Sequence, residues 1–252
     1  MAANERIVAI DGDIPCYSIG FASEGSPVEY ALHSIKKLIN KCKKACSADH
    51  YIIFLTGKGN FREERATLLP YKGNRKQEKP EHHAAIREYL IEHHGAIVID
   101  GAEADDALGI FLTEKEIGVE KIIATLDKDL NGVPGWHYNW KKDILYEVSL
   151  EEADAFFCEQ LLTGDSTDNI PGLFKVTGQR ATKKIKERVA EKETFAEQVF
   201  EVLEIYDECM NASSDMACSR QDVEDTVKEI GDLLWMHRDG EESWWEYYQK
   251  QP

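Results

Sequence analysis

Residues 96–130 read AIVIDGAEADDALGIFLTEKEIGVEKIIATLDKDL, and this stretch decides the fold class. A short β-branched run at 96–100 is followed by a helix-like segment at 103–117 and by a second β-branched run at 121–127. This alternation is typical of a βαβ unit, in which a crossover helix joins two parallel strands. Carboxylates follow both strand-like runs.

The same alternation extends in both directions along the chain. Further strand-like runs lie at 7–11, 51–55, 136–139 and 144–149, and helix-like segments lie at about 28–46 and 81–94. After Ser149 the strand pattern stops, and a helical region with one Gly/Pro-marked interruption at 169–178 continues nearly to the end. The sequence therefore predicts an α/β domain over 1–150, with a mostly parallel sheet flanked by helices, and a helical module over 151–252.

Composition excludes several classes of protein. The 252 residues are 42% hydrophobic, and no apolar run reaches the roughly 20 residues that cross a bilayer. The N-terminus lacks the pattern of a signal peptide, so we expect a soluble protein in the cytoplasm, with no membrane partner. The six cysteines form no C-x-x-C pair, which argues against a disulfide framework or a zinc knuckle.

The net charge of −17 conceals two basic segments. Local positive surface binds phosphate whatever the total charge, although each segment alone could be an ordinary solvated helix face. The first segment contains Lys58, Arg62, Arg65, Lys72, Arg75, Lys76 and Lys79, and the second contains Lys175, Arg180, Lys183, Lys184, Lys186 and Arg188.

Carboxylates follow three of the predicted strands. They are Asp11 and Asp13 after the first strand, Glu103, Asp105 and Asp106 after the third, and Asp127 and Asp129 after the fourth. The carboxyl ends of parallel strands share one edge of a sheet, so these side chains should converge. Taken singly, each group is better explained as a turn, a helix N-terminus or a solvated loop, but the three strand ends together favour a common site.

Like charges gathered at one edge raise one another's pKa, and bound cations are the usual compensation. Ligands that are all oxygen select Mg²⁺, with Mn²⁺ able to substitute. Two such ions about 4 Å apart can activate water and stabilise the leaving oxygen in phosphodiester cleavage. The sequence therefore predicts a site for two divalent ions.

Six motifs resemble the structure-specific 5′-nuclease family, which includes flap endonucleases, the 5′-nuclease domain of bacterial DNA polymerase I and phage 5′–3′ exonucleases. They are IDGD at 10–13, NFR at 60–62, PYKGNR at 70–75, EADD at 103–106, LDKD at 126–129 and GDSTDNIPG at 164–172. The resemblance covers residues 6 to about 190. It implies a PIN-like domain followed by a helix-hairpin module at 164–190 and acidic C-terminal helices.

The resemblance also assigns roles to residues of these motifs. Asp11, Glu103, Asp105 and Asp106 correspond to a first metal site, and Asp127, Asp129, Asp165 and Asp168 to a second, with Asp13 a further candidate. Lys72 and Arg75 correspond to catalytic cations that orient the scissile phosphate and stabilise its developing charge. DNA contacts are expected at Arg62, Lys76, Gly172, Lys175, Gly178, Arg180, Lys183 and Lys184, with a K⁺ site at the hairpin left open.

Two positions depart from the family's pattern. Thr56 or Gly57 stands where many members have an aspartate after the second strand. Lys175 and Thr177 stand in the hairpin where glycines are common.

The resemblance implies a metal-dependent 5′–3′ exonuclease or flap endonuclease that cuts DNA, or RNA in hybrids, near 5′ ends. The expected setting is phage-type DNA replication or degradation in a host cytoplasm. We expect a monomer with no nucleotide cofactor, because no phosphate-binding loop of the G-x-x-x-x-G-K type is present. A PIN-type ribonuclease and a non-catalytic binder of DNA structures remain the alternatives.

Overall fold

The computed structural model describes residues 5–76, 78–213, 217–240 and 243–251, so the first residues used in the signal-peptide argument lie outside it. The chain divides into two compact units. The sheet unit comprises Met1–Asn60, Gln77–Ser149 and Met236–Gly240, and the helical unit comprises Phe61–Lys76, Leu150–Trp235 and Glu241–Pro252. The simpler division into domains 1–150 and 151–252 stays a prediction.

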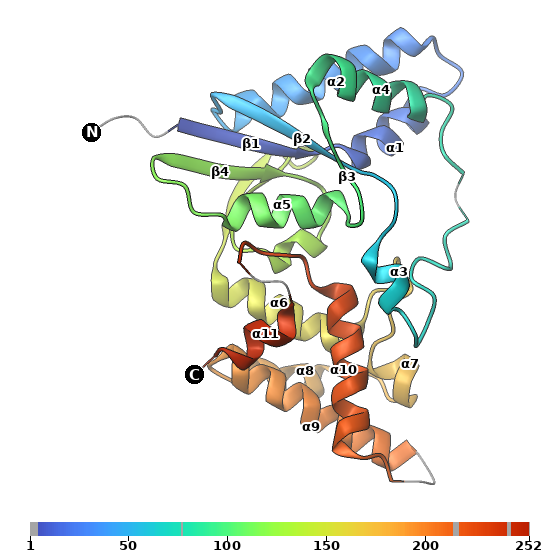
Figure 1. Ribbon diagram of the computed structural model, residues 1–252, viewed down its shortest axis with the longest axis vertical. Coiled ribbons are helices and arrows are strands. Elements are labelled where there is room, and N and C mark those ends of the chain that lie inside the picture. Colours follow the sequence, from blue (N-terminus) through green and yellow to red (C-terminus); the bar gives the residue numbers. More distant parts are fainter. Residues whose placement is uncertain (1–4, 77, 214–216, 241–242, 252) are drawn as a thin grey trace. The chain divides into compact units, whose positions relative to one another are not determined.

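The sheet unit contains six strands in the order β3-β2-β1-β4-β5-β6. Figure 1 labels β1, β2, β3 and β4. The strands from β3 to β5 are parallel, and β6 pairs antiparallel with β5. Their bounds are β1 Glu5–Asp11, β2 His50–Thr56, β3 Ile97–Ile99, β4 Val119–Ala124, β5 Gly135–Asn139 and β6 Ile144–Val148. The predicted fold class, a mostly parallel sheet flanked by helices, is confirmed.

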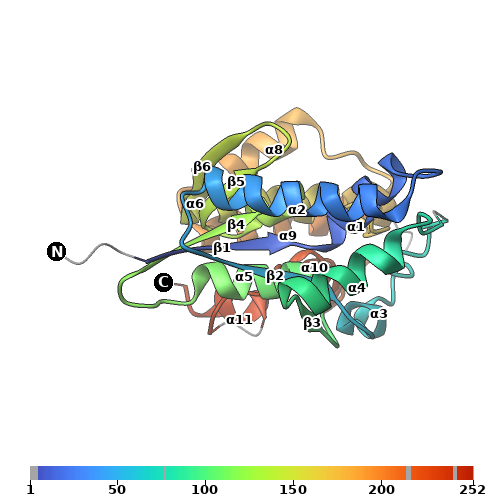
Figure 2. The ribbon, with the colours of Figure 1, turned by 90° about the horizontal axis from the view of Figure 1, so that it is seen from above.

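Helices cover both faces of this sheet (Figure 1). One face packs against α1 (Asp13–Ala22), α2 (Val28–Ala45) and α4 (His83–His94), and the other against α5 (Ala104–Thr113). Along β1 the side chains alternate between the faces, with Val8 and Ile10 in the first core and Ala9 in the second. This is the period of two expected of a buried strand. Figure 2 shows α2 running along the direction of β1.

The helix α1 has no counterpart among the predicted segments. Its sequence DIPCYSIGFA is apolar on several sides and contains Pro15 and Gly20, both of which are poor helix formers in most positions. Pro15 lies in the first turn, where a missing N–H costs little. Gly20 is needed for packing, because a Cβ there would lie 2.5 Å from Cγ of Pro80.

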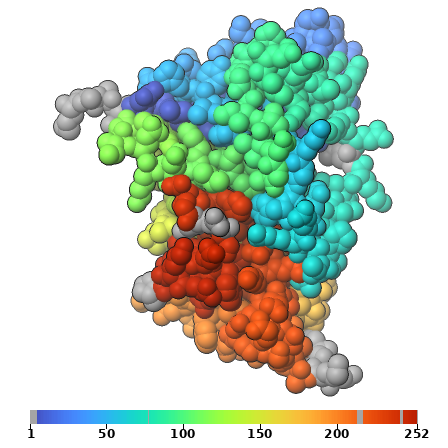
Figure 3. All heavy atoms as spheres, in the orientation of Figure 1, coloured from blue at the N-terminus to red at the C-terminus, as the bar shows by residue number. Residues whose placement is uncertain are grey.

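The helical unit is built from seven helices within the described residues. They are α3 Phe61–Arg65, α6 Leu150–Thr163, α7 Leu173–Thr177, α8 Lys183–Ala190, α9 Phe195–Ser213, α10 Arg220–Leu234 and α11 Trp244–Gln249. One apolar core contains residues of α6, α7, α8, α9, α10 and α11. Figure 3 shows the orange and red surface that α9 and α10 form side by side.

The C-terminal tryptophans Trp235 and Trp244 belong to this core. Trp235 and Trp244 are buried, and a Cβ at Gly231 would lie 2.2 Å from the Trp244 ring. The glycine therefore lets α10 approach the indole closely. No helix in the described ranges is long and apolar enough to cross a membrane.

Candidate metal and nucleic-acid site

The Thr125 hydroxyl links the carboxylate at one strand end to the backbone after the neighbouring strand. Asp11 is the last residue of β1, and Thr125 directly follows the neighbouring strand β4. Thr125 Oγ1 donates to Asp11 Oδ2 at 3.0 Å and accepts from the backbone N–H of Asp127 at 3.0 Å. Asp129, in the following turn, donates its N–H to Asp127 Oδ1 at 2.8 Å. Thr125 was not anticipated, although its place directly before LDKD could have indicated it.

The third acidic group lies at the N-terminus of α5. The Glu103 N–H donates to Asp106 Oδ2 at 3.1 Å in a capping box, and both side chains are buried. Asn60 Nδ2 donates to Glu103 Oε1 at 2.9 Å, and the His237 N–H donates to Asp106 Oδ1 at 3.3 Å. These two carboxylates therefore also cap the helix, which is the structural role weighed above.

The carboxylates of these groups raise one another's pKa. Burial raises the pKa of Asp105 well above its usual value, and the charges of Asp11, Asp127, Glu103 and Asp106 raise it further. Burial and the charge of Asp13 raise the pKa of Asp11 to about 7. Within the described residues the Asp105 carboxylate accepts no hydrogen bond. This concentration of negative charge is costly unless a cation joins it.

The donor set fits a hard divalent cation. Every candidate ligand is a carboxylate, and oxygen ligands are those preferred by Mg²⁺ and Mn²⁺. In the described part of the chain, no group of three or more His, Cys, Asp or Glu is arranged to hold an ion. The residues that would hold it are Asp11, Glu103, Asp105, Asp106 and Asp127.

Asp13 and Thr56 are held by other contacts. The Thr56 N–H donates to Asp13 Oδ2 at 3.0 Å, and Thr56 Oγ1 accepts from the Ala104 N–H at 2.9 Å. Arg87 from α4 donates to Asp13 Oδ1 at 3.4 Å and to the Thr56 carbonyl at 2.5 Å. Thr56 therefore supports the start of α5 where a carboxylate is more usual, and Arg87 balances Asp13. No sequence signal pointed to Arg87.

In the helical unit, Asp165 and Asp168 lie in a tight loop. A Cβ at Gly164 would lie 2.5 Å from the Gly172 nitrogen, so the loop's ends need glycine. Asp165 is buried and accepts from the Thr167 N–H at 2.7 Å. Asp127 and Asp129 belong to the sheet unit, so a second metal site formed by all four aspartates stays a proposal.

Asp168 is surrounded by the two catalytic candidates. Its carboxylate lies 2.5 Å from Arg75 Nη2 and 3.5 Å from Lys72 Nζ, and accepts from the Tyr71 hydroxyl at 3.0 Å. The Lys72 N–H donates to the Asp168 carbonyl at 2.8 Å. The sequence did not predict this pairing, which spans more than 90 residues.

Arg62 requires a correction. It has no exposed surface, and its guanidinium donates to the carbonyls of Leu233 at 2.9 Å and Trp235 at 2.7 Å. These carbonyls lie at the C-terminal end of α10, where free acceptors attract cations. The expected phosphate contact is therefore wrong for this structure, and Arg62 caps a helix instead.

The helix hairpin is formed by α7, a turn and α8. Gly178 has φ +77°, a conformation that glycine adopts without strain, and Thr182 caps α8 by accepting from the Ile185 N–H. Gly172 is buried, whereas the cationic candidates other than Arg62 are exposed. The exposed candidates are Lys76, Lys175, Arg180, Lys183 and Lys184. Their positions suit phosphate contacts, which stay predictions.

The sequence is similar to parts of much longer proteins. It is 29% identical over 209 residues to a thermostable DNA polymerase I of Thermus caldophilus, covering 72% of this chain and 24% of the polymerase. It is 26% identical over 241 residues to DNA polymerase I of Caldicellulosiruptor bescii, covering 84% of this chain and 28% of that one. The chain thus spans about a quarter of the length of these relatives. No protein-family model matches it.

The fold matches that of T5 5′-exonuclease. A structure of that protein with bound zinc ions has a TM-score of 0.53 and 17% identity, covering 92% of this chain and 100% of the other. A mutant form gives a TM-score of 0.51 at 17% identity over the same shares. The chain thus has the fold of T5 5′-exonuclease, and its sequence similarity to DNA polymerase I covers most of its length.

Proposed function

We propose that this chain is a divalent-metal-dependent 5′–3′ exonuclease and flap endonuclease, which hydrolyses phosphodiester bonds near 5′ ends of DNA. Mg²⁺ is the proposed metal, with two ions bound and Mn²⁺ able to substitute. RNA in hybrids is a further substrate, K⁺ is a further ligand at the hairpin, and the chain acts as a monomer in the cytoplasm.

One observation carries this proposal: the Thr125 hydroxyl joins the Asp11 carboxylate at the end of β1 to the backbone of Asp127 after β4, and the charges of both aspartates act on Asp105 at the start of α5. A salt-bridge partner for Asp11 or Asp105 is absent from the described residues. A structural network would balance such charges internally. Carboxylates that lie close together without a positively charged partner are typical of a site that binds a cation from solution.

The residues of the two units have different proposed roles. In the sheet unit, Thr125 and the backbone N–H groups after β1 hold Asp11 and Asp127 in orientation. A divalent ion at these carboxylates would lower the pKa of a bound water and stabilise the leaving oxygen. In the helical unit, Lys72 and Arg75 supply cations for the scissile phosphate, and Asp168 fixes their positions.

The similar proteins support the substrate and the metal. DNA polymerase I acts on DNA, T5 5′-exonuclease is by name a nuclease for 5′ ends, and one of its structures holds zinc ions. The exposed cations of the hairpin suit a duplex backbone, because such contacts position nucleic acid without reading its bases.

The test is cleavage of a 5′-labelled flap duplex and of its 3′-flap mirror, in Mg²⁺ and in EDTA, by the native chain and by Asp127→Ala. We expect cutting of the 5′ structure only, in Mg²⁺ only, with little or none in the variant. Asp143→Ala is the matched control, since Asp143 lies in the same unit and pairs with Lys41 and Tyr138.

The other outcomes select the alternatives. Binding without cutting in Mg²⁺ and Mn²⁺ would favour the non-catalytic binder, a reading that Thr56 at the end of β2 supports. Preference for single-stranded RNA over a 5′-ended duplex would favour a PIN-type ribonuclease.

A further inference from the structure

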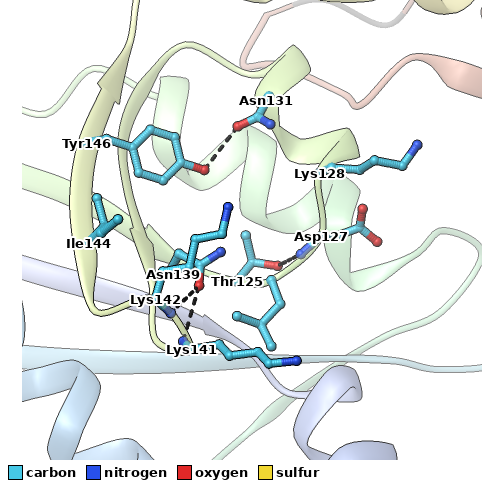
Figure 4. Close-up of a pocket in the computed structure, with 10 residues that line it drawn as sticks. Thr125, Asp127, Lys128, Asn131, Asn139, Lys141, Lys142, Ile144 and Tyr146 are labelled. Atoms are coloured by element: carbon cyan, nitrogen blue, oxygen red, sulfur yellow. Dashed lines mark hydrogen bonds between the residues drawn. The ribbon is translucent and has the colours of Figure 1, made fainter.

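A cavity of about 580 Å³ opens in the sheet unit beside Asp127. Figure 4 shows Asn131 and Tyr146 on one side of it and Thr125, Asn139 and Lys141 on the other. The residues come from the turn after β4 and from the β5–β6 hairpin. No motif of the sequence pointed to this hairpin as functional.

The lining is positively charged although the chain is strongly acidic. Lys128, Lys141 and Lys142 oppose a single carboxylate, Asp127, so three positive charges meet one negative charge. The net charge of the whole chain is −17. Lys128 contacts Asp129 at 3.3 Å, whereas Lys141 and Lys142 are exposed, and their ammonium groups form no ion pair with any described residue. Such a local reversal of charge favours an anionic ligand.

Two half-buried amides add further donors. Asn131 Oδ1 accepts from the Tyr146 hydroxyl at 3.0 Å. Asn139 Oδ1 accepts from the N–H groups of Lys141 and Lys142 at 3.1 and 2.9 Å. Because both oxygens are engaged, each amide turns its NH₂ group to the remaining space, and neither NH₂ has a partner among the described residues. The cavity thus presents donors and needs acceptors.

The remaining surface is apolar. Leu126, Ile144 and the ring of Tyr146 contribute it, and the Tyr146 ring stacks on His137 with 5.3 Å between centroids. A flat aromatic surface beside phosphate donors suits a nucleobase, because every base offers a face for stacking. The volume lies within the usual range for small-ligand sites.

We infer that this cavity binds one nucleotide of the nucleic acid, with the phosphate held by Lys141, Lys142 and the two amides and the base against Tyr146. The inference deepens the proposed function, on which it rests only for the neighbouring role of Asp127. The ligand class is a nucleoside 5′-monophosphate, either as product or as a unit of the strand.

The test measures equilibrium binding of thymidine 5′-monophosphate, thymidine and inorganic phosphate to the full chain in EDTA, where no cleavage occurs. We expect the monophosphate to bind at least tenfold more tightly than either fragment. Two variants probe the donors. Lys141→Ala/Lys142→Ala removes both ammonium groups, and Asn139→Asp keeps the accepting oxygen but replaces a donor with a charge.

Both variants should weaken monophosphate binding about tenfold, as expected for loss of charge-assisted contacts. The matched controls are Lys36→Ala/Lys37→Ala and Asn40→Asp, which alter exposed residues of α2 in the same unit and should bind as the native chain does. Equal binding in variants and controls would overturn the inference, as would equal affinity for inorganic phosphate.

Cleavage of the 5′ flap, measured in parallel, separates the two hypotheses. Cleavage by the native chain without monophosphate binding would refute nucleotide binding in the cavity and would leave the proposed nuclease activity supported. If the native chain binds the monophosphate, the variants bind it more weakly and no flap is cut, nucleotide binding in the cavity is supported and the nuclease activity is refuted.

Discussion

The carboxylates at the strand ends of the sheet unit differ from Asp168 in the helical unit in how their charge is balanced. Asp11 is held by a hydroxyl and by backbone N–H groups, and its nearest charges are other carboxylates. Asp168 lies between Lys72 and Arg75. The helical unit therefore supplies its own counter-charges, whereas the strand ends depend on a cation from solution. Substitutions in the two places should have opposite effects.

The largest effect is expected for Asp105→Asn. Loss of one ligand should remove several kcal/mol of stabilisation of the transition state, so cleavage of a 5′ flap in Mg²⁺ should fall about 10³-fold. Single-turnover cleavage measures this. Native rates in the variant would show that Asp105 holds no metal.

The same variant should be more stable than the native chain in EDTA. A carboxyl whose folded pKa is raised stabilises the fold only while protonated, so stability falls as pH rises through that pKa. The amide of the variant carries no charge, so the variant escapes this loss. Thermal unfolding at pH 5 and pH 8 measures it: the native chain should lose stability over this range, and Asp105→Asn should lose less. An equal loss of stability in the native chain and in Asp105→Asn would show that the Asp105 charge does not destabilise the fold.

Arg62→Gln should cost about 3 kcal/mol of unfolding free energy, because two buried carbonyls lose a charged donor. Arg65→Gln is the control on the same short helix. Arg65 is 45% exposed and lies 3.5 Å from Asp232, so less than about 1 kcal/mol should be lost. Urea unfolding distinguishes them. Unchanged stability with weaker DNA binding in Arg62→Gln would instead restore the phosphate contact.

Asp168→Asn should lower the melting temperature in EDTA, the opposite of Asp105→Asn. The expected loss is about 1 kcal/mol, since the Arg75 side chain is 52% exposed and water weakens its ion pair. Thermal unfolding at pH 7.5 measures it. A rise in melting temperature would show that Asp168, like the carboxylates at the strand ends, lacks a sufficient positive partner.

The smallest effect is expected at the exposed hairpin. Lys183→Ala/Lys184→Ala should leave the melting temperature unchanged and reduce the salt dependence of duplex binding by about two phosphate contacts. Affinity measured across salt concentrations tests this. An unchanged dependence of affinity on salt concentration would show that Lys183 and Lys184 do not contact DNA phosphates.

The sequence predicted features that depend on local pattern. Alternating apolar residues indicated the strands, and acidic residues directly after them indicated where the carboxylates would gather. It missed α1, whose Pro15 and Gly20 make sense only in the packed structure. It misjudged Arg62, because burial of a cation depends on carbonyls more than 170 residues away. The pairing of Asp168 with Arg75 and the donor-lined cavity likewise depend on tertiary contacts.

The most direct measurement is a Mn²⁺ binding isotherm at pH 7.5, followed by electron paramagnetic resonance, for the native chain and Asp105→Asn. We expect saturable Mn²⁺ binding by the native chain and at least tenfold weaker binding by the variant. No saturable binding to the native chain, or equal binding to both, would contradict a metal site at the strand ends.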